Sequence, residues 1–555
     1  MLENKPFSYT DRSGIIASLR EGPFDLLVIG GGITGAGIAL DAASRGLKVA
    51  LVEKSDFASG TSSKSTKLIH GGLRYLKQFD FWLVRDVGSE RAVVHKLAPH
   101  LVLPEKMLLP LIENGSYGKL LTSIGLKVYD ILAHVEDDDK RKMLEKEEAL
   151  ALEPLLPPDI LNGAGYYAEY RTDDARLTIE VIKTSLHYGA VALNYAEVCG
   201  FIYKDKNLSG AVVSDMAGGE TFEIHAAHVV NAAGPWVDDI RNLNSSKKGK
   251  RLHLTKGIHL VFPREKLPIR QSVYFDVPDG RMIFAIPRGK TTYVGTTDTN
   301  YDKDKDHVSA NLADANYLIS AVNNMFPSIE LQLADIESSW AGLRPLIHEE
   351  GKSASELSRK DEIFVSDSGL ISIAGGKLTG YRKMAERVVN KVVAKIEEER
   401  NIKVPDSATE IIRLCGGNFK NYKQVKKYIA TIHSQIRADG FTEYDAWYLV
   451  TTYGKQTETI FDIYKTLEGT NNASRMIRAE LHFCLRYEMV STPQDFFIRR
   501  TGRLYFDIDS VRTFMDVVLR EFCQLMQDDG SQFARWKESL DQELRAHSQF
   551  EPENS

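Results

Sequence analysis

Short apolar runs recur along the N-terminal two thirds of the chain. The runs DLLVI, VALVE, HVVN and LISIA occupy residues 25–29, 49–53, 228–231 and 370–374. Continuous apolar runs of this length are typical of strands buried on both faces of a parallel sheet. These runs lie too far apart in the sequence for a compact βαβ repeat. The chain between them must therefore form another part of the fold.

The intervening chain carries a different pattern, in which β-branched and aromatic residues alternate or cluster between proline, glycine and aspartate. Residues 259–263, 281–287 and 291–298 read HLVFP, RMIFAIP and TTYVGTTD. Such segments predict a largely antiparallel sheet. We interpret this sheet as the substrate domain.

After about Asn401 the apolar positions fall three and four residues apart, as in residues 423–436, 445–454 and 510–526. This spacing predicts helices. The predicted fold class is therefore α/β: a Rossmann-like nucleotide-binding domain interleaved with a mainly antiparallel β-sheet substrate domain, followed by a C-terminal α-helical domain.

The expected domain boundaries follow from these changes of pattern. Residues 1–20 form an N-terminal extension, and residues 21–400 contain the nucleotide-binding domain with the interleaved substrate domain. The substrate parts are expected at about 100–160 and 245–345, and the helical domain at 401–555.

The first apolar run continues into glycines that stand in G-x-G-x-x-G register. Gly30, Gly32 and Gly35 would allow a tight turn, close backbone approach to a pyrophosphate and close packing of the next helix. Glu53 ends the second run 23 positions after Gly30, where a carboxylate can accept hydrogen bonds from a ribose. A glycine triplet alone is compatible with an ordinary loop, but the strand context and the spaced acid favour an adenine dinucleotide.

Composition and charge narrow the classes of function. The 555 residues include 70 basic and 76 acidic side chains, and the net charge of −6 argues against nonspecific binding to nucleic acid. The four cysteines form no C-x-x-C pair, so we expect no metal site and a reducing, cytoplasmic compartment. No run approaches the ~20 apolar residues of a transmembrane helix, so any membrane contact is expected to be peripheral.

Residues 59–76, SGTSSKSTKLIHGGLRYL, concentrate hydroxyl, basic and glycine residues in one short segment. Thr61, Ser62 and Ser63 can donate hydrogen bonds to a diphosphate or to a flavin edge. Alone, the segment would be read as a serine-rich surface turn. The dinucleotide motif upstream favours a cofactor contact instead.

Two later segments pass from a strand-like run into small residues. Residues 228–240 contain AAGP, where the chain can cross beneath a cofactor, and residues 369–389 form a second strand-to-glycine-to-helix element. Gly376 could present its amide to the cofactor, with Lys377 beside the ring. The alternative is a tight turn before a surface helix.

With these motifs, the chain resembles the FAD-dependent glycerol-3-phosphate dehydrogenase family, within the wider D-amino-acid-oxidase-like flavoproteins. The resemblance runs nearly end to end through DLLVIGGGITGAGIALDAASRGLKVALVEK, FASGTSSKSTKLIHGGLRYL, VNAAGPWVD, AGLRPL and GGKLTGYRKMAE. YEMVSTPQDFFIRRTGR resembles the family's helical domain. The resemblance implies that FAD takes a hydride from sn-glycerol 3-phosphate, giving dihydroxyacetone phosphate. Electrons then pass to a quinone in dehydrogenases or to oxygen in oxidases.

The resemblance also implies the site residues. The implied catalytic residues are His70, His259, Arg344 and Lys377, and the implied substrate contacts are Arg74, Tyr75, Arg344 and Arg359. The implied cofactor contacts are Gly30, Gly32, Gly35, Glu53, Lys54, Thr61, Ser62, Ser63, Lys67, Leu68, Val198, Ala233, Gly234, Trp236, Gly376, Lys377, Leu378 and Thr379.

The reaction needs such groups. A phosphate dianion is matched by a guanidinium fork, which suits Arg344. A secondary alcohol must lose its hydroxyl proton as it gives up hydride, and a histidine suits that general base. His259 is preferred over His70 because the strand that follows Lys256 and Gly257 could place it over the ring.

Other functions remain open at this point. They are a glycerol-3-phosphate oxidase, a relative that oxidises an amino acid, and a noncatalytic flavin-binding regulator. The expected partners are glycerol 3-phosphate, a quinone and the cytoplasmic membrane surface, and a homo-oligomer stays open. Residues 120–132, LLTSIGLKVYDIL, have helical spacing that could dock on lipid, although a core-facing helix is the more ordinary interpretation.

Overall fold

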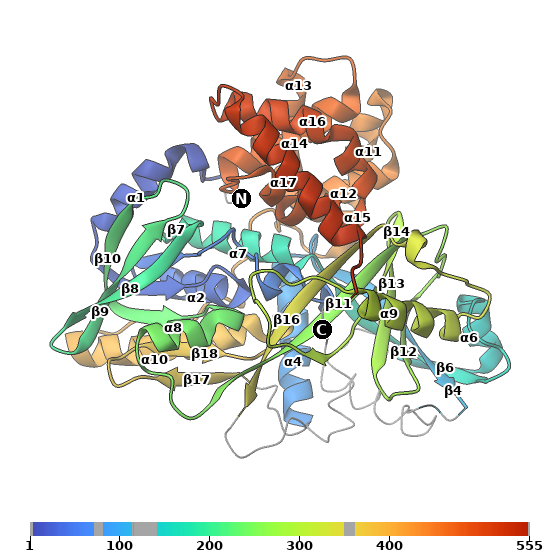
Figure 1. Cartoon of the computed structure of the whole chain (residues 1–555), viewed down its shortest axis with the longest axis horizontal. Coiled ribbons are helices and arrows are strands. Elements are labelled where there is room, and N and C mark those ends of the chain that lie inside the picture. Colours follow the sequence, from blue (N-terminus) through green and yellow to red (C-terminus); the bar gives the residue numbers. More distant parts are fainter. Residues whose placement is uncertain (1–3, 71–80, 114, 116–140, 349–360, 553–555) are drawn as a thin grey trace.

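The computed structural model describes residues 4–70, 81–113, 115, 141–348 and 361–552, with the backbone alone at 81–87. Two sheets lie side by side, and a layer of helices covers one end of both (Figure 1). The predicted fold class is confirmed.

The first sheet has the spatial order β17-β18-β10-β1-β2-β7. β1 is paired in parallel with both β10 and β2, so the chain leaves all three strands at the same edge. The antiparallel meander of β8 and β9 extends from β10. The strands are β1 (Phe24–Ile29), β2 (Val49–Val52), β7 (Val191–Leu193), β8 (Ala196–Lys204), β9 (Asn207–Asp215), β10 (Thr221–Asn231), β17 (Glu362–Val365) and β18 (Ile371–Ala374).

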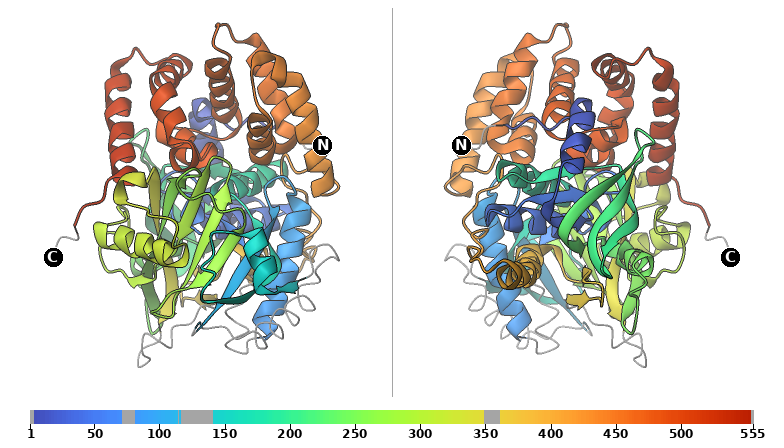
Figure 2. Two further views of the ribbon diagram at one scale, coloured as in Figure 1. Left: turned by 90° about the vertical axis from the view of Figure 1, so that its right-hand side faces the viewer. Right: turned by 90° about the vertical axis from the view of Figure 1, so that its left-hand side faces the viewer.

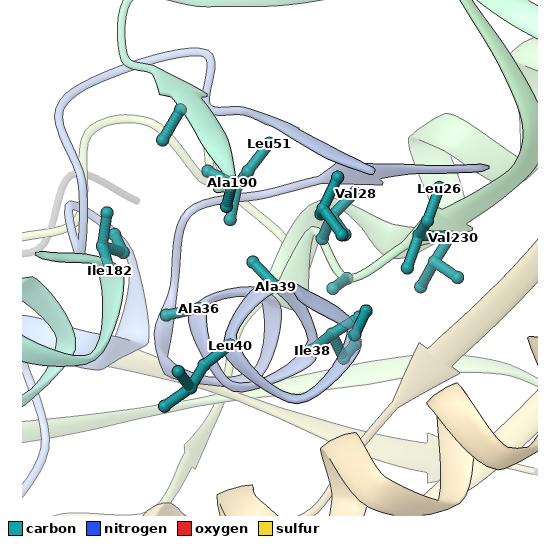
Figure 3. Packing of buried hydrophobic residues seen from close by; sticks show 14 of the residues in the cluster. Leu26, Val28, Ala36, Ile38, Ala39, Leu40, Leu51, Ile182, Ala190 and Val230 are labelled. Atoms are coloured by element: carbon teal, nitrogen blue, oxygen red, sulfur yellow. The ribbon is translucent and has the colours of Figure 1, made fainter. Parts of the chain in front are cut away.

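Three helices pack together against the first sheet: α2 (Ile33–Ser44), α7 (Asp174–His187) and α10 (Tyr381–Arg400), with α2 in contact with both others. Figure 3 shows Ala39 and Ile38 of α2 close to Val28 and Val230 of the sheet, and all four side chains are fully buried. The continuous apolar runs therefore form the core of this layer.

The N-terminal helix α1 (Arg12–Arg20) contacts β7 and β10 of the first sheet. Arg12 forms a buried ion pair with Asp215 at 2.5 Å. The N-terminal extension thus packs on the nucleotide-binding domain.

The second sheet has the spatial order β15-β11-β14-β13-β12-β4-β6-β3, with β16 on β11 and β5 on β6. Its pairings are antiparallel except that of β12 with β4. Its strands are β3 (Leu68–Ile69), β4 (Leu103–Ile112), β5 (Lys142–Leu144), β6 (Leu161–Arg171), β11 (Arg251–Pro263), β12 (Ser272–Asp276), β13 (Met282–Arg288), β14 (Thr291–Gly295), β15 (Thr299–Asn300) and β16 (Ser338–His348). β3 lies before the expected substrate segments, and β6 begins just after the first of them. β3 nevertheless belongs to this sheet, because Leu68 and Ile69 pair with the end of β6.

The C-terminal helices form the layer coloured orange to red in Figures 1 and 2. They are α11 (Tyr422–Ile436), α12 (Glu443–Tyr453), α13 (Thr457–Thr466), α14 (Asn472–Tyr487), α15 (Arg503–Phe506), α16 (Ile508–Leu525) and α17 (Ser531–Ser548). Their apolar residues belong to one core cluster with Tyr293 and Trp340 of the second sheet. The helical domain is therefore continuous in packing with the substrate domain.

Candidate active site

A cavity of about 410 Å³ opens where the carboxyl edge of the first sheet meets the second sheet. This volume lies within the range of small-molecule sites. Its walls come from the β1–α2 turn, the end of β2, β8 and the segments 59–65, 232–240 and 375–378. Residues distant in sequence meet there because parallel strands end at one edge.

The β1–α2 turn is a close-packed glycine turn. Gly30 has φ +110°, and a Cβ on it would lie 2.7 Å from the carbonyl oxygen of Ala232. A Cβ on Gly35 would lie 1.9 Å from the carbonyl oxygen of Gly30. Gly32 is the N-cap residue of α2 and lines the cavity. The amides at the start of this helix are therefore placed to bind an anion.

Glu53 follows β2 and lines the same cavity. Its carboxylate accepts hydrogen bonds from the amides of Gly31 at 2.7 Å and Ser55 at 3.0 Å. Burial raises the pKa of Glu53 above its ordinary value, and these two amides oppose that rise. The acid is therefore fixed beside the glycine turn, where a ribose would lie.

Trp236 forms part of the cavity wall. The Lys54 ammonium lies 4.4 Å from the centre of the Trp236 ring and forms an ion pair with Asp306 at 2.5 Å. The buried indole N–H of Trp236 has no hydrogen-bond partner among the described residues. An aromatic wall with an unused donor fits a flat polar ligand.

Most of the implied cofactor contacts line this cavity. These are Gly30, Gly32, Glu53, Lys54, Thr61, Ser62, Val198, Ala233, Gly234, Trp236, Gly376, Lys377 and Leu378. The other five, Gly35, Ser63, Lys67, Leu68 and Thr379, do not line it.

Lys67 shows why such residues lie behind the wall. Its ammonium forms a buried ion pair with Asp174 at 2.5 Å and donates to the carbonyl oxygen of Ser63 at 3.0 Å. Asp174 also accepts from the hydroxyl of Ser65 at 2.6 Å. Lys67 thus holds the segment 59–66 in place from behind.

The same segment rests on the second sheet through strand β16. Thr61 donates to the carbonyl oxygen of Leu343 at 2.7 Å, and the indole N–H of Trp340 donates to the carbonyl oxygen of Ser65 at 3.0 Å. A Cβ on Gly342 would lie 2.5 Å from the carbonyl oxygen of Lys64. The cofactor wall and the substrate sheet are therefore in direct contact.

His259 lies on this face of the second sheet. Its ring stacks on Trp340 with 4.7 Å between centres and an interplanar angle of 11°. Its Nε2 lies 3.0 Å from the hydroxyl of Thr66, and the ring covers Gly295, where a Cβ would lie 2.1 Å away. Burial, followed by the charge of Arg344, holds the pKa of His259 well below its ordinary value, so the ring is neutral.

Arg344 is on the same face because residues 340, 342 and 344 alternate along β16. Its guanidinium donates to the carbonyl oxygen of Thr297 at 3.0 Å, to Asp298 at 3.1 Å and to the hydroxyl of Thr296 at 2.9 Å. About a third of the side chain is exposed. The fork is held in orientation and still reaches solvent.

His70 and Lys377 form a second pair of implied catalytic residues. The hydroxyl of Thr379 donates to the carbonyl oxygen of His70 at 3.2 Å. Burial, then the charge of Lys377, lowers the pKa of His70 to about 3. The His70 ring lies 6.0 Å from that of Phe284, which pairs with Gly295 beside His259. Both histidines therefore face the same part of the second sheet.

Three implied substrate contacts, Arg74, Tyr75 and Arg359, lie outside the described residues, as does the segment 120–132. Thr66 and Trp340 were not among the predicted site residues, although they contact His259 directly. The alternation of β16 is the signal that places Trp340 on the face of Arg344. Thr66 has no such signal, because it lies in an irregular segment.

Comparison with known protein families accounts for this arrangement. The family model for FAD dependent oxidoreductases matches residues 25–382. The chain belongs to the FAD-dependent oxidoreductases. A second model, the C-terminal domain of alpha-glycerophosphate oxidase, matches residues 407–532 of this oxidoreductase.

Relatives of this FAD-dependent oxidoreductase match it nearly end to end. It is 48% identical over 544 residues to the aerobic glycerol-3-phosphate dehydrogenase of Bacillus subtilis, with 98% of each chain covered. It is 46% identical over 537 residues to the protein of the same name from Staphylococcus aureus, with 96% of each chain covered. The resemblance drawn from the motifs is confirmed.

Solved structures agree. The glycerol-3-phosphate dehydrogenase of Bacillus halodurans complexed with FAD is 42% identical and has a TM-score of 0.83 over 99% of both chains. The L-alpha-glycerophosphate oxidase of Mycoplasma pneumoniae with FAD bound has a TM-score of 0.54 at 20% identity and covers 69% of this chain and 96% of its own. That second likeness shows the fold alone.

FAD is the predicted cofactor, and the prediction is confirmed by the family. The cavity fits it, because the glycine turn, the fixed Glu53 carboxylate and the donor of Trp236 are present together. None of the helices in the described residues combines the length and apolar character needed to span a bilayer.

Proposed function

We propose that this oxidoreductase converts sn-glycerol 3-phosphate to dihydroxyacetone phosphate and passes the electrons to a quinone. The observation that carries the proposal is the placement of Arg344 and His259 on one face of the second sheet, against the wall of the cofactor cavity. The guanidinium of Arg344 can bind a phosphate, and the imidazole of His259 can accept a hydroxyl proton. The names of the relatives support the choice of substrate.

Arg344 binds the substrate phosphate. Two of its nitrogens already point at Thr296, Thr297 and Asp298, so the plane of the guanidinium is fixed before substrate arrives. A fixed fork loses little entropy on binding a phosphate dianion. The Asp298 carboxylate pairs with the guanidinium at 3.1 Å and helps to orient it.

His259 accepts the proton of the substrate hydroxyl. A depressed pKa keeps the imidazole neutral, which leaves one ring nitrogen free to act as a base. Thr66 holds Nε2 at 3.0 Å and Trp340 fixes the ring plane. His70 is the second candidate, and its pKa of about 3 makes it neutral as well.

Lys377 places a positive charge on the wall of the cavity, where it would stabilise the negative charge that the bound cofactor gains when it accepts hydride from the substrate. Bound FAD supplies the acceptor for that hydride. Of the substrate contacts proposed with the resemblance, Arg74, Tyr75 and Arg359 would complete the substrate site.

The electron acceptor and the location rest on the resemblance. We assign a quinone, peripheral attachment to the membrane and a cytoplasmic location. The curated relatives are named aerobic glycerol-3-phosphate dehydrogenases, which favours a dehydrogenase over the oxidase.

The test is anaerobic reduction of the yellow holoenzyme, followed by its flavin absorbance. Glycerol 3-phosphate should bleach the flavin rapidly, while glycerol and glycine at equal concentration should not. Bleaching by glycine would favour the amino-acid oxidising alternative, and no bleaching by any of them would favour the regulator. The reduced enzyme is then mixed with a short-chain quinone or with air-saturated buffer. Reoxidation by oxygen with stoichiometric peroxide, and none by quinone, would make the protein an oxidase.

A further inference from the structure

Asp56 is a fully buried carboxylate three residues beyond Glu53. It accepts hydrogen bonds from Nη1 of Arg500 at 2.7 Å, from Nη2 of Arg500 at 2.8 Å and from Nε of Arg499. The side-chain amide of Asn194 donates to it at 3.0 Å. Two guanidinium groups thus converge on one carboxylate of the nucleotide-binding domain.

Both arginines come from η10 (Asp495–Arg500), a π-helical turn of the C-terminal domain. Arg499 also pairs with Asp495 at 2.7 Å, and Arg500 donates to the carbonyl oxygen of Glu488 at 2.8 Å. Burial would raise the pKa of Asp56, but Arg500 and Arg499 lower it to about 2. The contact is therefore ionic at neutral pH, and its side chains are almost completely buried.

The segment from Glu53 to Ala58 links this contact to the cofactor cavity. Glu53 accepts from the amide of Gly31, and the amide of Ala58 donates to the carbonyl oxygen of Gly31 at 3.1 Å. The ring of Phe57 lies 2.6 Å from the position of a Cβ on Gly31. Asp56 lies between these contacts, so its displacement would shift the wall around the glycine turn.

We propose that Asp56 couples FAD binding to the docking of the C-terminal helical domain. Arg499 and Arg500 hold the segment from Glu53 to Ala58 in the shape that accepts the dinucleotide. Coupling between two sites is reciprocal, so bound FAD tightens the contact with η10. Asp56, Arg499 and Arg500 are positioning residues, since they act on the cofactor through Glu53 and Gly31.

The first test measures FAD affinity of apoprotein by the quenching of flavin fluorescence. Asp56→Asn keeps the size of the side chain but removes its charge. FAD affinity should fall roughly 5- to 150-fold, the usual range of coupling between sites. Arg499→Lys should recover part of the affinity lost in Arg499→Gln, because it retains a positive charge beside Asp56.

The matched control is Glu521→Gln. Glu521 is a mostly buried carboxylate that accepts from Arg478 at 2.8 Å and His482 at 2.5 Å within the C-terminal domain. The Glu521→Gln substitution should lower the melting temperature without changing FAD affinity. Wild-type affinity in Asp56→Asn, or an equal loss in Glu521→Gln, would overturn the proposal.

A second measurement needs no variant and decides the matter if Asp56→Asn does not fold. Amide hydrogen exchange is compared in wild-type apoprotein and holoenzyme. Exchange in residues 491–506 should slow when FAD binds, while that in α13 should not change. Equal exchange at 491–506 in the two states would overturn the coupling. FAD binding itself is shown separately by the flavin spectrum.

Discussion

The glycines of the G-x-G-x-x-G motif are required for different physical reasons. Gly35 is required by packing, because a Cβ there would meet the carbonyl oxygen of Gly30. A Cβ on Gly32 would lie 3.1 Å from the hydroxyl oxygen of Ser62 and otherwise face the cavity. One position serves the fold and the other serves the ligand.

Gly32→Val should therefore yield folded protein that lacks FAD, whereas Gly35→Ala should impair folding itself. A Cβ at position 35 would overpack the glycine turn. Overpacking typically lowers the free energy of unfolding by about 1–3 kcal/mol. The measurements are flavin content after purification and the melting temperature of the apoprotein. A Gly32→Val protein with full flavin content would contradict the placement of the pyrophosphate at this turn.

Arg344→Lys tests the phosphate anchor. The ammonium of lysine cannot replace the two parallel hydrogen bonds of a guanidinium. Loss of a hydrogen bond to a charged group costs about 1.5–3 kcal/mol of binding free energy. kcat/KM for glycerol 3-phosphate should fall roughly 10- to 200-fold, and discrimination against glycerol should shrink. The control is Arg281→Lys just before β13, where the side chain is 40% exposed and pairs with Asp279. Equal kinetics in both variants would remove Arg344 from the substrate site.

Gly295→Ala tests the placement of His259 without changing the histidine. A Cβ at 295 would lie 2.1 Å from the ring, so the imidazole must move. Flavin reduction should slow on the order of 10²-fold, as in His259→Asn, if His259 is the base. Bound FAD should be unchanged. Because burial lowers the pKa of both His70 and His259, neither histidine of the free enzyme should titrate near the ordinary histidine pKa of about 6.5. Slow reduction in His70→Asn alone would reverse the assignment.

At the scale of the element, strand β16 serves two domains at once. It pairs with β11 from Ser338 to His348 and carries Arg344 on one face. Its first residues bind the helical domain, since Ser338 donates to the carbonyl oxygen of Tyr505 at 2.6 Å and Ser339 to that of His547 at 2.9 Å. The strand therefore links the substrate site to α15 and α17.

Glu337, just before β16, should make the folding stability of the protein depend on pH. Burial, then the charges of Asp509, Asp507 and Glu265, raises its pKa to about 7. A group whose pKa is higher in the folded state contributes stability below its unfolded pKa and loses it as pH rises through the folded value. Glu337→Gln should therefore melt higher than wild type at about pH 8.5 and no higher at about pH 5. The carboxyl is partly exposed, so the difference should be on the order of 1 kcal/mol. If the two proteins differed in melting temperature by the same amount at both pH values, ionisation of Glu337 would not be the cause.

The elements that the sequence predicts well are those with strong local patterns. The runs at 25–29 and 49–53 lie within a residue of β1 and β2, and 423–436 lies within α11. β3 could not be predicted, because two residues have no period and depend on pairing with β6. The parallel pairing of β12 with β4 is also set by distant contacts.

At the scale of the whole molecule, the helical domain is joined to the rest by buried charges. Arg176 of α7 pairs with Glu488 at 2.6 Å, and Lys183 pairs with Glu488 at 2.9 Å. All three side chains are nearly inaccessible. Charged residues are normally read as surface residues, so the sequence predicted the domain order but not this attachment. Without the helical domain, Arg176 and Lys183 would share the single carboxylate of Glu180. A buried cation that lacks a full partner is strongly destabilising.

The interleaving of the first sheet also determines how the protein can be made. β1 and β2 leave the ribosome early, but β10 follows only at Thr221–Asn231 and β18 at Ile371–Ala374. During that interval the growing chain carries strand edges that have no neighbours, and such edges promote aggregation. A fragment that ends before β18 leaves one edge of β10 open. The yield of this enzyme in a cell should depend on chaperones that shelter the unfinished sheet during translation.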